Sequence, residues 1–265
     1  MFEIEFLGTG NAAQVPVWGC VCIACARAKQ DNTYRRRSAS LAIHTTTGIT
    51  LVDAGLTDLA ERFEFDSIER IVLTHFHMDH VQGLFHLRWS EREERIPVYR
   101  PDDALGADDL YKHPGVLDFQ PPLSPFKMID VGEFSITPLP LIHSRITLGY
   151  LFEVYSPAIS AVCKIAYLTD TVGLPEATQN YLADAFIDIL IIDCSEPPRD
   201  QPPKNHNDVN CVLNIHNQIQ PKRTVLTHIS HRLDQWLMEQ AAQKVKAVLP
   251  NEVTVARDGQ RLSCF

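Results

Sequence analysis

The stretch His75-Phe76-His77-Met78-Asp79-His80 places four candidate metal ligands within six residues. It follows Val72-Leu73-Thr74, which is typical of the end of a buried strand. A strand that turns into a loop can direct successive side chains into one cavity. Imidazole nitrogens suit zinc, manganese, iron or nickel, and carboxylates suit harder ions. Because so tight a loop cannot easily give four ligands to one metal, we expect two metals, with His75 and His77 on one and Asp79 and His80 on the other.

Three further candidate ligands stand alone, each directly after an apolar run: His143, Asp170 and His228. Any one of them would more often be structural, but their shared placement indicates ligands. Asp53, in Leu51-Val52-Asp53-Ala54-Gly55, precedes the cluster. We expect Asp53 to hold the ligand loop by hydrogen bonds and not to bind metal; an ordinary turn aspartate is the alternative.

A second group of ligands consists of Cys20, Cys22 and Cys25, which predict a structural zinc site. Tetrahedral zinc needs a fourth ligand, and His231 is a reasonable partner from a distant part of the chain. Such a closed site would serve folding; redox or merely buried thiols are the alternative. The remaining cysteines, at 163, 194, 211 and 264, are expected to be buried or incidental thiols, because the odd total of seven argues against a disulfide framework.

Composition restricts the class of protein. The chain has 265 residues, 45% of them hydrophobic and 22% charged, which excludes a disordered or fibrous class. Its net charge of −9 disfavours nucleic acid as a partner. The basic run Arg35-Arg36-Arg37 is expected to be a solvated face. No apolar run reaches the roughly 18 residues of a membrane span, and Met1–Phe6 is unlike a signal peptide, so we expect a cytoplasmic protein without membrane contact.

Short β-like runs alternate with helical stretches along the chain. The expected strands are 3–7, 41–45, 49–52, 71–74, 98–100, 134–138, 149–154, 164–168, 189–192 and 224–227. The expected helices are 56–62, 103–111, 176–184, 207–219 and 234–249. This pattern predicts one α/β domain over residues 1–265, a four-layer αββα sandwich with a structural zinc loop at about 18–30.

The ligand pattern resembles that of the metallo-β-lactamase superfamily of hydrolases. The resemblance implies one metal site of His75, His77 and His143 and a second of Asp79, His80 and His228, with Asp170 bridging the two. Within the superfamily, Trp18-Gly19 and the cysteine cluster are typical of the PhnP-like cyclic phosphodiesterases. The chain resembles that family over nearly its whole length. The matching stretches are 77–85 (HMDHVQGLF), 109–115 (DLYKHPG), 193–195 (DCS), 205–206 (NH), 227–231 (THISH) and 236–239 (WLME).

That resemblance implies the chemistry. Its substrate would be 5-phospho-ribose 1,2-cyclic phosphate, its product ribose 1,5-bisphosphate, and its setting phosphonate catabolism by the carbon–phosphorus lyase pathway. Two Mn²⁺ ions, or Zn²⁺, would occupy the active site, beside one structural Zn²⁺. His206 and Asp79 are the expected catalytic residues, with His206 protonating the leaving oxygen. Arg145 and Lys112 are candidates for the 5-phosphate, although a solvated surface charge is the commoner role. A homodimer is also implied.

Three rival functions remain open from the sequence. An RNA-processing nuclease of the same superfamily would need a basic path or an RNA-gripping arm, which the sequence lacks. A lactone or thioester hydrolase could use the same metals. A catalytically inactive scaffold would keep the fold and the zinc, but here every expected ligand position is filled.

Overall fold

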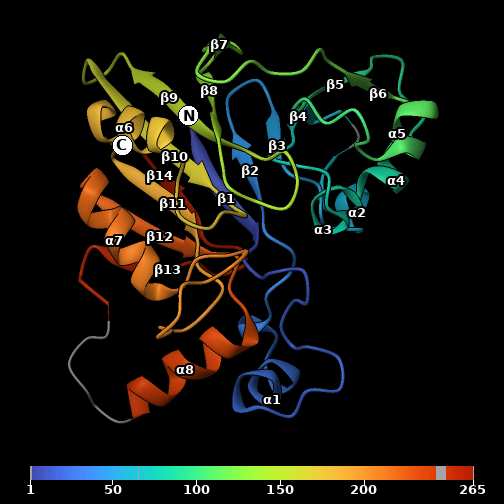
Figure 1. The fold of residues 1–265 in the computed structure, drawn as a ribbon. Coiled ribbons are helices and arrows are strands. Elements are labelled where there is room, and N and C mark those ends of the chain that lie inside the picture. The colour runs from blue at the N-terminus through green and yellow to red at the C-terminus, as the bar shows by residue number, and fades with distance from the viewer. Residues whose placement is uncertain (1, 65, 243–248, 265) are drawn as a thin grey trace.

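Two β-sheets lie face to face between layers of helices (Figure 1). The computed structural model describes residues 2–64, 66–242 and 249–264, and in that part of the chain each sheet has seven strands. The first sheet runs in the order β14 (Arg261–Ser263), β1 (Glu3–Gly8), β2 (Ser40–His44), β3 (Ile49–Val52), β4 (Ile68–Val72), β5 (Ile96–Tyr99) and β6 (Leu117–Phe119). The second runs β13 (Val253–Val255), β12 (Arg223–Thr227), β11 (Ile189–Asp193), β10 (Ala161–Leu168), β9 (Leu148–Ser156), β8 (Ser135–Pro140) and β7 (Ile129–Asp130).

The helices cover the outer faces of the sheets. On the first sheet lie α2 (Leu59–Arg62), α3 (Met78–Val81), α4 (Leu84–Leu87) and α5 (Asp108–Lys112). On the second lie α6 (Glu176–Ala185), α7 (Val209–Ile219) and α8 (His231–Ala242). The helix α1 (Ile23–Gln30) and the short η1 (Asn32–Tyr34) belong to the cysteine loop, and α1 packs on α8. This arrangement confirms the predicted four-layer αββα fold.

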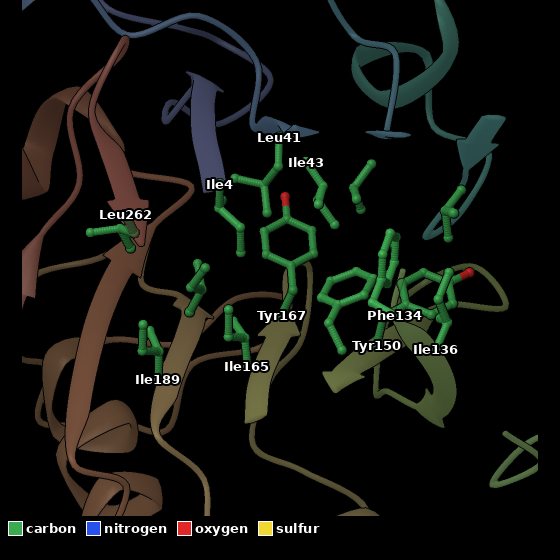
Figure 2. Packing of buried hydrophobic residues seen from close by; sticks show 14 of the residues in the cluster. Ile4, Leu41, Ile43, Phe134, Ile136, Tyr150, Ile165, Tyr167, Ile189 and Leu262 are labelled. Atoms are coloured by element: carbon green, nitrogen blue, oxygen red, sulfur yellow. The ribbon is translucent and has the colours of Figure 1, made fainter. Parts of the chain in front are cut away.

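The core between the sheets explains why strands from both halves of the chain stack. Ile4, Leu41 and Ile43 of the first sheet face Ile165 and Tyr167 of the second (Figure 2). All five side chains are buried. Each buried side chain of this size contributes about 1.5–3 kcal/mol through removal of apolar area from water. Two further apolar clusters fill the spaces between each sheet and the helices that cover it. The strands therefore bury apolar side chains on both faces: one face packs on the other sheet and the opposite face packs on helices.

The register of the parallel strands places their carboxyl ends at one edge. In the first sheet Val52 of β3 pairs with Val72 of β4. In the second sheet Leu168, Ile192 and Leu226 are level across β10, β11 and β12. Residues that follow these strands therefore meet at a common edge, where open α/β sheets bind ligands.

Helix boundaries differ modestly from the expected ones. The helix expected over 103–111 is shorter, because Asp103 instead accepts the backbone N–H groups of Leu105 and Gly106 and holds a turn. The last expected helix begins at His231, earlier than predicted, and its predicted residues 243–248 lie outside the described residues. The helix α1 within the cysteine loop was not expected.

Two predictions about single residues are wrong. Cys163 and Cys264 form a disulfide that joins β10 to the segment after β14, although they are 101 residues apart and share no spacing motif. Arg36 is not a solvated charge: it is 7% exposed and forms two hydrogen bonds to the Asp234 carboxylate, at 2.9 and 3.0 Å. A run of three arginines does not reveal that its middle member turns inward to a carboxylate on a distant helix.

Candidate metal centre

The metal-ligand candidates converge at the carboxyl edge of the parallel strands. His75 and its neighbours follow β4, Asp170 follows β10, and His228 follows β12. Asp53, Asp170 and His228 have φ values of 62°, 59° and 58°, in the left-handed region that non-glycine residues seldom adopt. Such backbone strain is typical of functional sites, where the surrounding fold imposes it. Here the turn after each strand directs a side chain toward His80, at the edge where the expected ligands meet.

The first candidate metal site contains His75, His77, His143 and Asp170. His77 Nδ1 lies 2.9 Å from His75 Nε2 and 3.2 Å from His143 Nε2. Asp170 Oδ2 lies 3.6 Å from His75 Nε2 and 3.5 Å from His143 Nε2. Ligands bound at about 2.0–2.2 Å to one zinc-sized ion are separated by about 3–3.5 Å, so these atoms surround a space that fits one ion.

The second candidate site contains Asp79, His80 and His228, with the other oxygen of Asp170. Asp170 Oδ1 lies 3.3 Å from both His80 Nε2 and His228 Nε2. Asp79 Oδ2 lies 3.3 Å from His80 Nε2 and 4.0 Å from His228 Nε2. The two oxygens of Asp170 thus face different clusters, which is the arrangement of a bridging carboxylate. All seven ligands expected from the sequence lie together, and their binding of metal remains a prediction.

Two buried ring nitrogens support the fit to metal. Among the described residues, His80 Nε2 and His228 Nε2 have no hydrogen-bond partner. A buried polar atom without a partner is costly, and a metal ion would provide one. Burial also lowers the pKa of His75 well below its usual value, and lowers the pKa of His77 and of His143. Neutral imidazoles are the form that binds metal. At His80 burial also lowers the pKa, but the charges of Asp170 and Asp53 outweigh burial and raise the pKa well above its usual value.

Asp53 has the supporting position expected from the sequence. It is fully buried, and its Oδ1 accepts the Thr74 backbone N–H at 2.8 Å. Its Oδ2 lies 2.8 Å from His80 Nδ1. A hydrogen bond there fixes the His80 ring so that Nε2 points at Asp79 and Asp170. Asp53 therefore orients a ligand and joins β3 to the loop that follows β4.

His206 stands at the edge of the second site. A ring nitrogen of His206 lies within 4.8 Å of donor atoms of Asp170 and His228, and its ring stacks on His228 with centroids 4.6 Å apart. Its Nδ1 lies 2.7 Å from Asp193 Oδ2. Burial lowers the pKa of His206, but the hydrogen bond and charge of Asp193 outweigh it, and with Asp170 and Asp79 raise the pKa to about 9. His206 thus lies beside the expected metal ligands, and its role as a proton donor remains a prediction.

Asp193 and Ser195, to which the sequence assigned no role, support this edge of the site. Asp193 ends β11 with no exposure and also accepts the Thr171 backbone N–H at 3.1 Å. Ser195 Oγ lies 2.9 Å from His228 Nδ1. This contact orients the His228 ring, as the contact of Asp53 orients the His80 ring. An acidic residue directly after the apolar run 189–192 is the signal that could have identified Asp193.

The cysteine cluster forms as expected. Cys20, Cys22, Cys25 and His231 offer donor atoms within 4.8 Å of one another. His231 Nδ1 lies 3.4 Å from Cys20 Sγ and 3.5 Å from Cys22 Sγ. With zinc bonds of about 2.3 Å to sulfur and about 2.0 Å to nitrogen, these separations suit one tetrahedral ion. His231 begins α8 three residues after His228, so this cluster lies next to an expected ligand of the other site.

A cavity of about 360 Å³ opens onto the clusters of His and Asp ligands; we call it the metal cavity. Its lining includes Asp79, His143, Asp170, Asn205 and His206. Arg145 and Lys112, the residues expected to bind a 5-phosphate, do not line it. Arg145 holds Asp103 and the Phe76 carbonyl, and Lys112 is exposed and paired with Asp108.

Comparison with known proteins identifies the class. The beta-lactamase superfamily domain matches residues 50–229, and the chain belongs to that family. A crystal structure of a diphosphatase from the PhnP family superposes with a TM-score of 0.78 at 26% identity, covering 98% of this chain and 96% of the other. Human tRNase Z, short form (ELAC1), shares the fold, with a TM-score of 0.65 at 20% identity over 99% of both chains.

One curated relative has a different name. The octanoyltransferase of Porphyromonas gingivalis is 27% identical over 242 residues, which are 85% of this chain and 45% of that protein. The chain thus spans about half the length of that relative.

Together, the family and the similarity to a PhnP-family diphosphatase support a metal-dependent phosphoric diester hydrolase. The fold and the two His and Asp clusters imply divalent metal. No helix in the described residues has the length and apolar character needed to cross a membrane.

Proposed function

We propose that the chain is a dinuclear-metal cyclic phosphodiesterase that converts 5-phospho-ribose 1,2-cyclic phosphate into ribose 1,5-bisphosphate, a step of phosphonate catabolism. The observation that carries the proposal is Asp170, whose two carboxylate oxygens face two separate ligand clusters 3.3–3.6 Å away. Similarity to a PhnP-family diphosphatase over nearly the whole chain supports the phosphoric ester class. We propose manganese as the active-site metal, in two ions, and zinc at the cysteine cluster.

Hydrolysis of the cyclic diester adds water to phosphorus and breaks the bond between phosphorus and the ribose O2. Two bound divalent ions would lower the pKa of a water and neutralise phosphate charge. The residues of the chain orient the reactants. His206 donates a proton to O2 as the P–O2 bond breaks, and the freed hydroxyl and the new 1-phosphate are the products. Asp193 holds the Nδ1 of His206, which leaves the other ring nitrogen for the substrate.

The test is the metal content of the purified protein together with hydrolysis of bis-p-nitrophenyl phosphate and the ribosyl cyclic phosphate, with and without added manganese. We expect about three metals per chain, one of them zinc that survives dialysis, and diesterase activity that rises with manganese. One zinc per chain and no diesterase activity with any metal would refute the proposal and favour an inactive scaffold.

A second candidate is hydrolysis of an acyl thioester, which the match to about half of an octanoyltransferase favours. The same metals can activate water toward a carbonyl carbon. Release of thiol from an octanoyl thioester by the metal-loaded protein, without diesterase activity, would select this function. An RNA-processing nuclease is disfavoured by the net charge of −9.

A further inference from the structure

A second cavity, of about 480 Å³, adjoins the metal cavity and shares Asn205 and His206 with it. We call it the side cavity. It is lined entirely by the segment 196–206, which connects β11 to α7. A substrate held at the metal ligands can therefore extend past His206 into the side cavity. The chemistry of this cavity decides what the extension can be.

The side cavity has a cationic wall. Arg199 and Lys204 line it, and Glu196 is the acidic residue among its lining residues. Neither cation forms an ion pair within the described ranges, whereas Arg145 and Lys112 are each paired with an aspartate. On a chain of net charge −9, two unpaired cations next to the reaction site favour an anionic group of the substrate.

The backbone of the segment 196–206 is held by a buried aspartate at the start of α7. Asp208, 1% exposed, accepts the Arg199 backbone N–H at 3.1 Å and the Cys211 backbone N–H at 2.8 Å. The same carboxylate therefore caps α7 and fixes the segment at Arg199. Four prolines, at 197, 198, 202 and 203, reduce the number of conformations open to the rest of the segment. Because the backbone of the segment is held before binding, less conformational entropy is lost when its two cations bind an anion.

We propose that Arg199 and Lys204 form a subsite for a second phosphate group, so that the enzyme selects cyclic phosphodiesters that carry a phosphomonoester at the far end of the sugar. This inference rests on the proposed function and names its specificity residues. Sequence reasoning could not find them, because both stand in a proline-rich loop without a phosphate-binding motif.

The test compares two substrates that differ by one group: ribose 1,2-cyclic phosphate with and without the 5-phosphate. The variants are Arg199→Gln, Lys204→Gln and the double change; Lys112→Gln and Arg261→Gln, outside both cavities, are the controls. We expect each single change to raise KM for the phosphorylated substrate about tenfold and the double change about a hundredfold, since a hydrogen bond to a charged group contributes that much. KM for the substrate without 5-phosphate, and kcat for both, should stay within about twofold.

Calorimetry gives a readout that does not depend on turnover. Ribose 1,5-bisphosphate should bind the metal-loaded wild type more tightly than ribose 1-phosphate, and the double variant should lose that difference. The subsite would be refuted if the double change raised KM equally for both substrates, or if the double variant kept the wild type's preference for ribose 1,5-bisphosphate. Absence of diesterase activity in the wild type would instead refute the proposed function, and the calorimetric comparison would still decide the subsite.

Discussion

His206, the proposed proton donor, is paired with Asp193 beside the clusters of expected metal ligands. The 2.7 Å contact holds the ring, and stacking on His228 fixes its plane. We expect His206→Gln to lower kcat for the ribosyl cyclic phosphate by about 10²–10⁴, with metal content unchanged. For bis-p-nitrophenyl phosphate, whose leaving group needs no proton, kcat should fall much less. Steady-state kinetics and metal analysis check this, with His113→Gln as the control; equal losses on both substrates would contradict it.

Asp53 is expected to affect metal binding by orienting the ring of His80, without binding the metal itself. Its carboxylate is buried between Thr74 and His80, which its contacts hold together. We expect Asp53→Asn to weaken active-site metal binding about 10–100-fold while the fold remains. Metal retained after dialysis against graded chelator measures the effect. Asp58→Asn is the matched control, because the Asp58 carboxylate pairs with Arg37 and Arg62 and does not line the metal cavity. Equal retention in both variants would refute the role.

At the scale of elements, the cysteine loop and α8 are joined by the candidate zinc site. Cys22 caps α1 and His231 begins α8, so zinc would clamp two helices that are far apart in the chain. We expect Cys22→Ser to remove the retained zinc and to lower the unfolding temperature by about 5–10 °C, since a loss of a few kcal/mol shifts a domain of this size by that much. Cys211→Ser, outside the cluster, should leave the zinc in place. A retained third metal in Cys22→Ser would contradict this assignment.

A buried ion pair supports the same junction. Arg36 binds Asp234 of α8 and donates to the Ala256 carbonyl at 2.7 Å, so it joins the loop, α8 and the C-terminal segment. Asp234→Asn should lower the free energy of unfolding by about 3–5 kcal/mol, because it leaves a buried guanidinium without its counter-charge. Asp58→Asn, which breaks the partly exposed pair with Arg37, should cost less than about 1 kcal/mol. Denaturant titration compares the two, and equal losses would contradict the burial argument.

The sequence predicted the strands and the local ligand cluster because both depend on near neighbours. Alternating apolar residues identify a strand, and His75 to His80 stand in one loop. The isolated residues His143, Asp170 and His228 could be grouped because each comes shortly after a strand, although β8 before His143 is antiparallel to its neighbours. By contrast, the roles of Ser195 and of the Arg36–Asp234 pair depend on contacts between distant segments, which no local spacing encodes. Arg199 likewise has a role only once the loop is placed beside the metal cavity.

At the scale of the whole molecule, Cys163 and Cys264 tie the two sheets together. Cys163 is a buried residue of β10 in the second sheet, and Cys264 follows β14 at the edge of the first. A cross-link over 101 residues restricts the unfolded chain, so it should stabilise the fold by about 2–4 kcal/mol. Cys264→Ser should lower the free energy of unfolding by that amount, and reductant should then have no further effect. The same variant should keep its metals and its kcat, because neither cysteine lines the metal cavity. Cys211→Ser is the control with an unpaired thiol. If Cys264→Ser and the wild type unfold at the same denaturant concentration without reductant, the bond does not hold the sheets together, and the apolar core between them stabilises their contact alone.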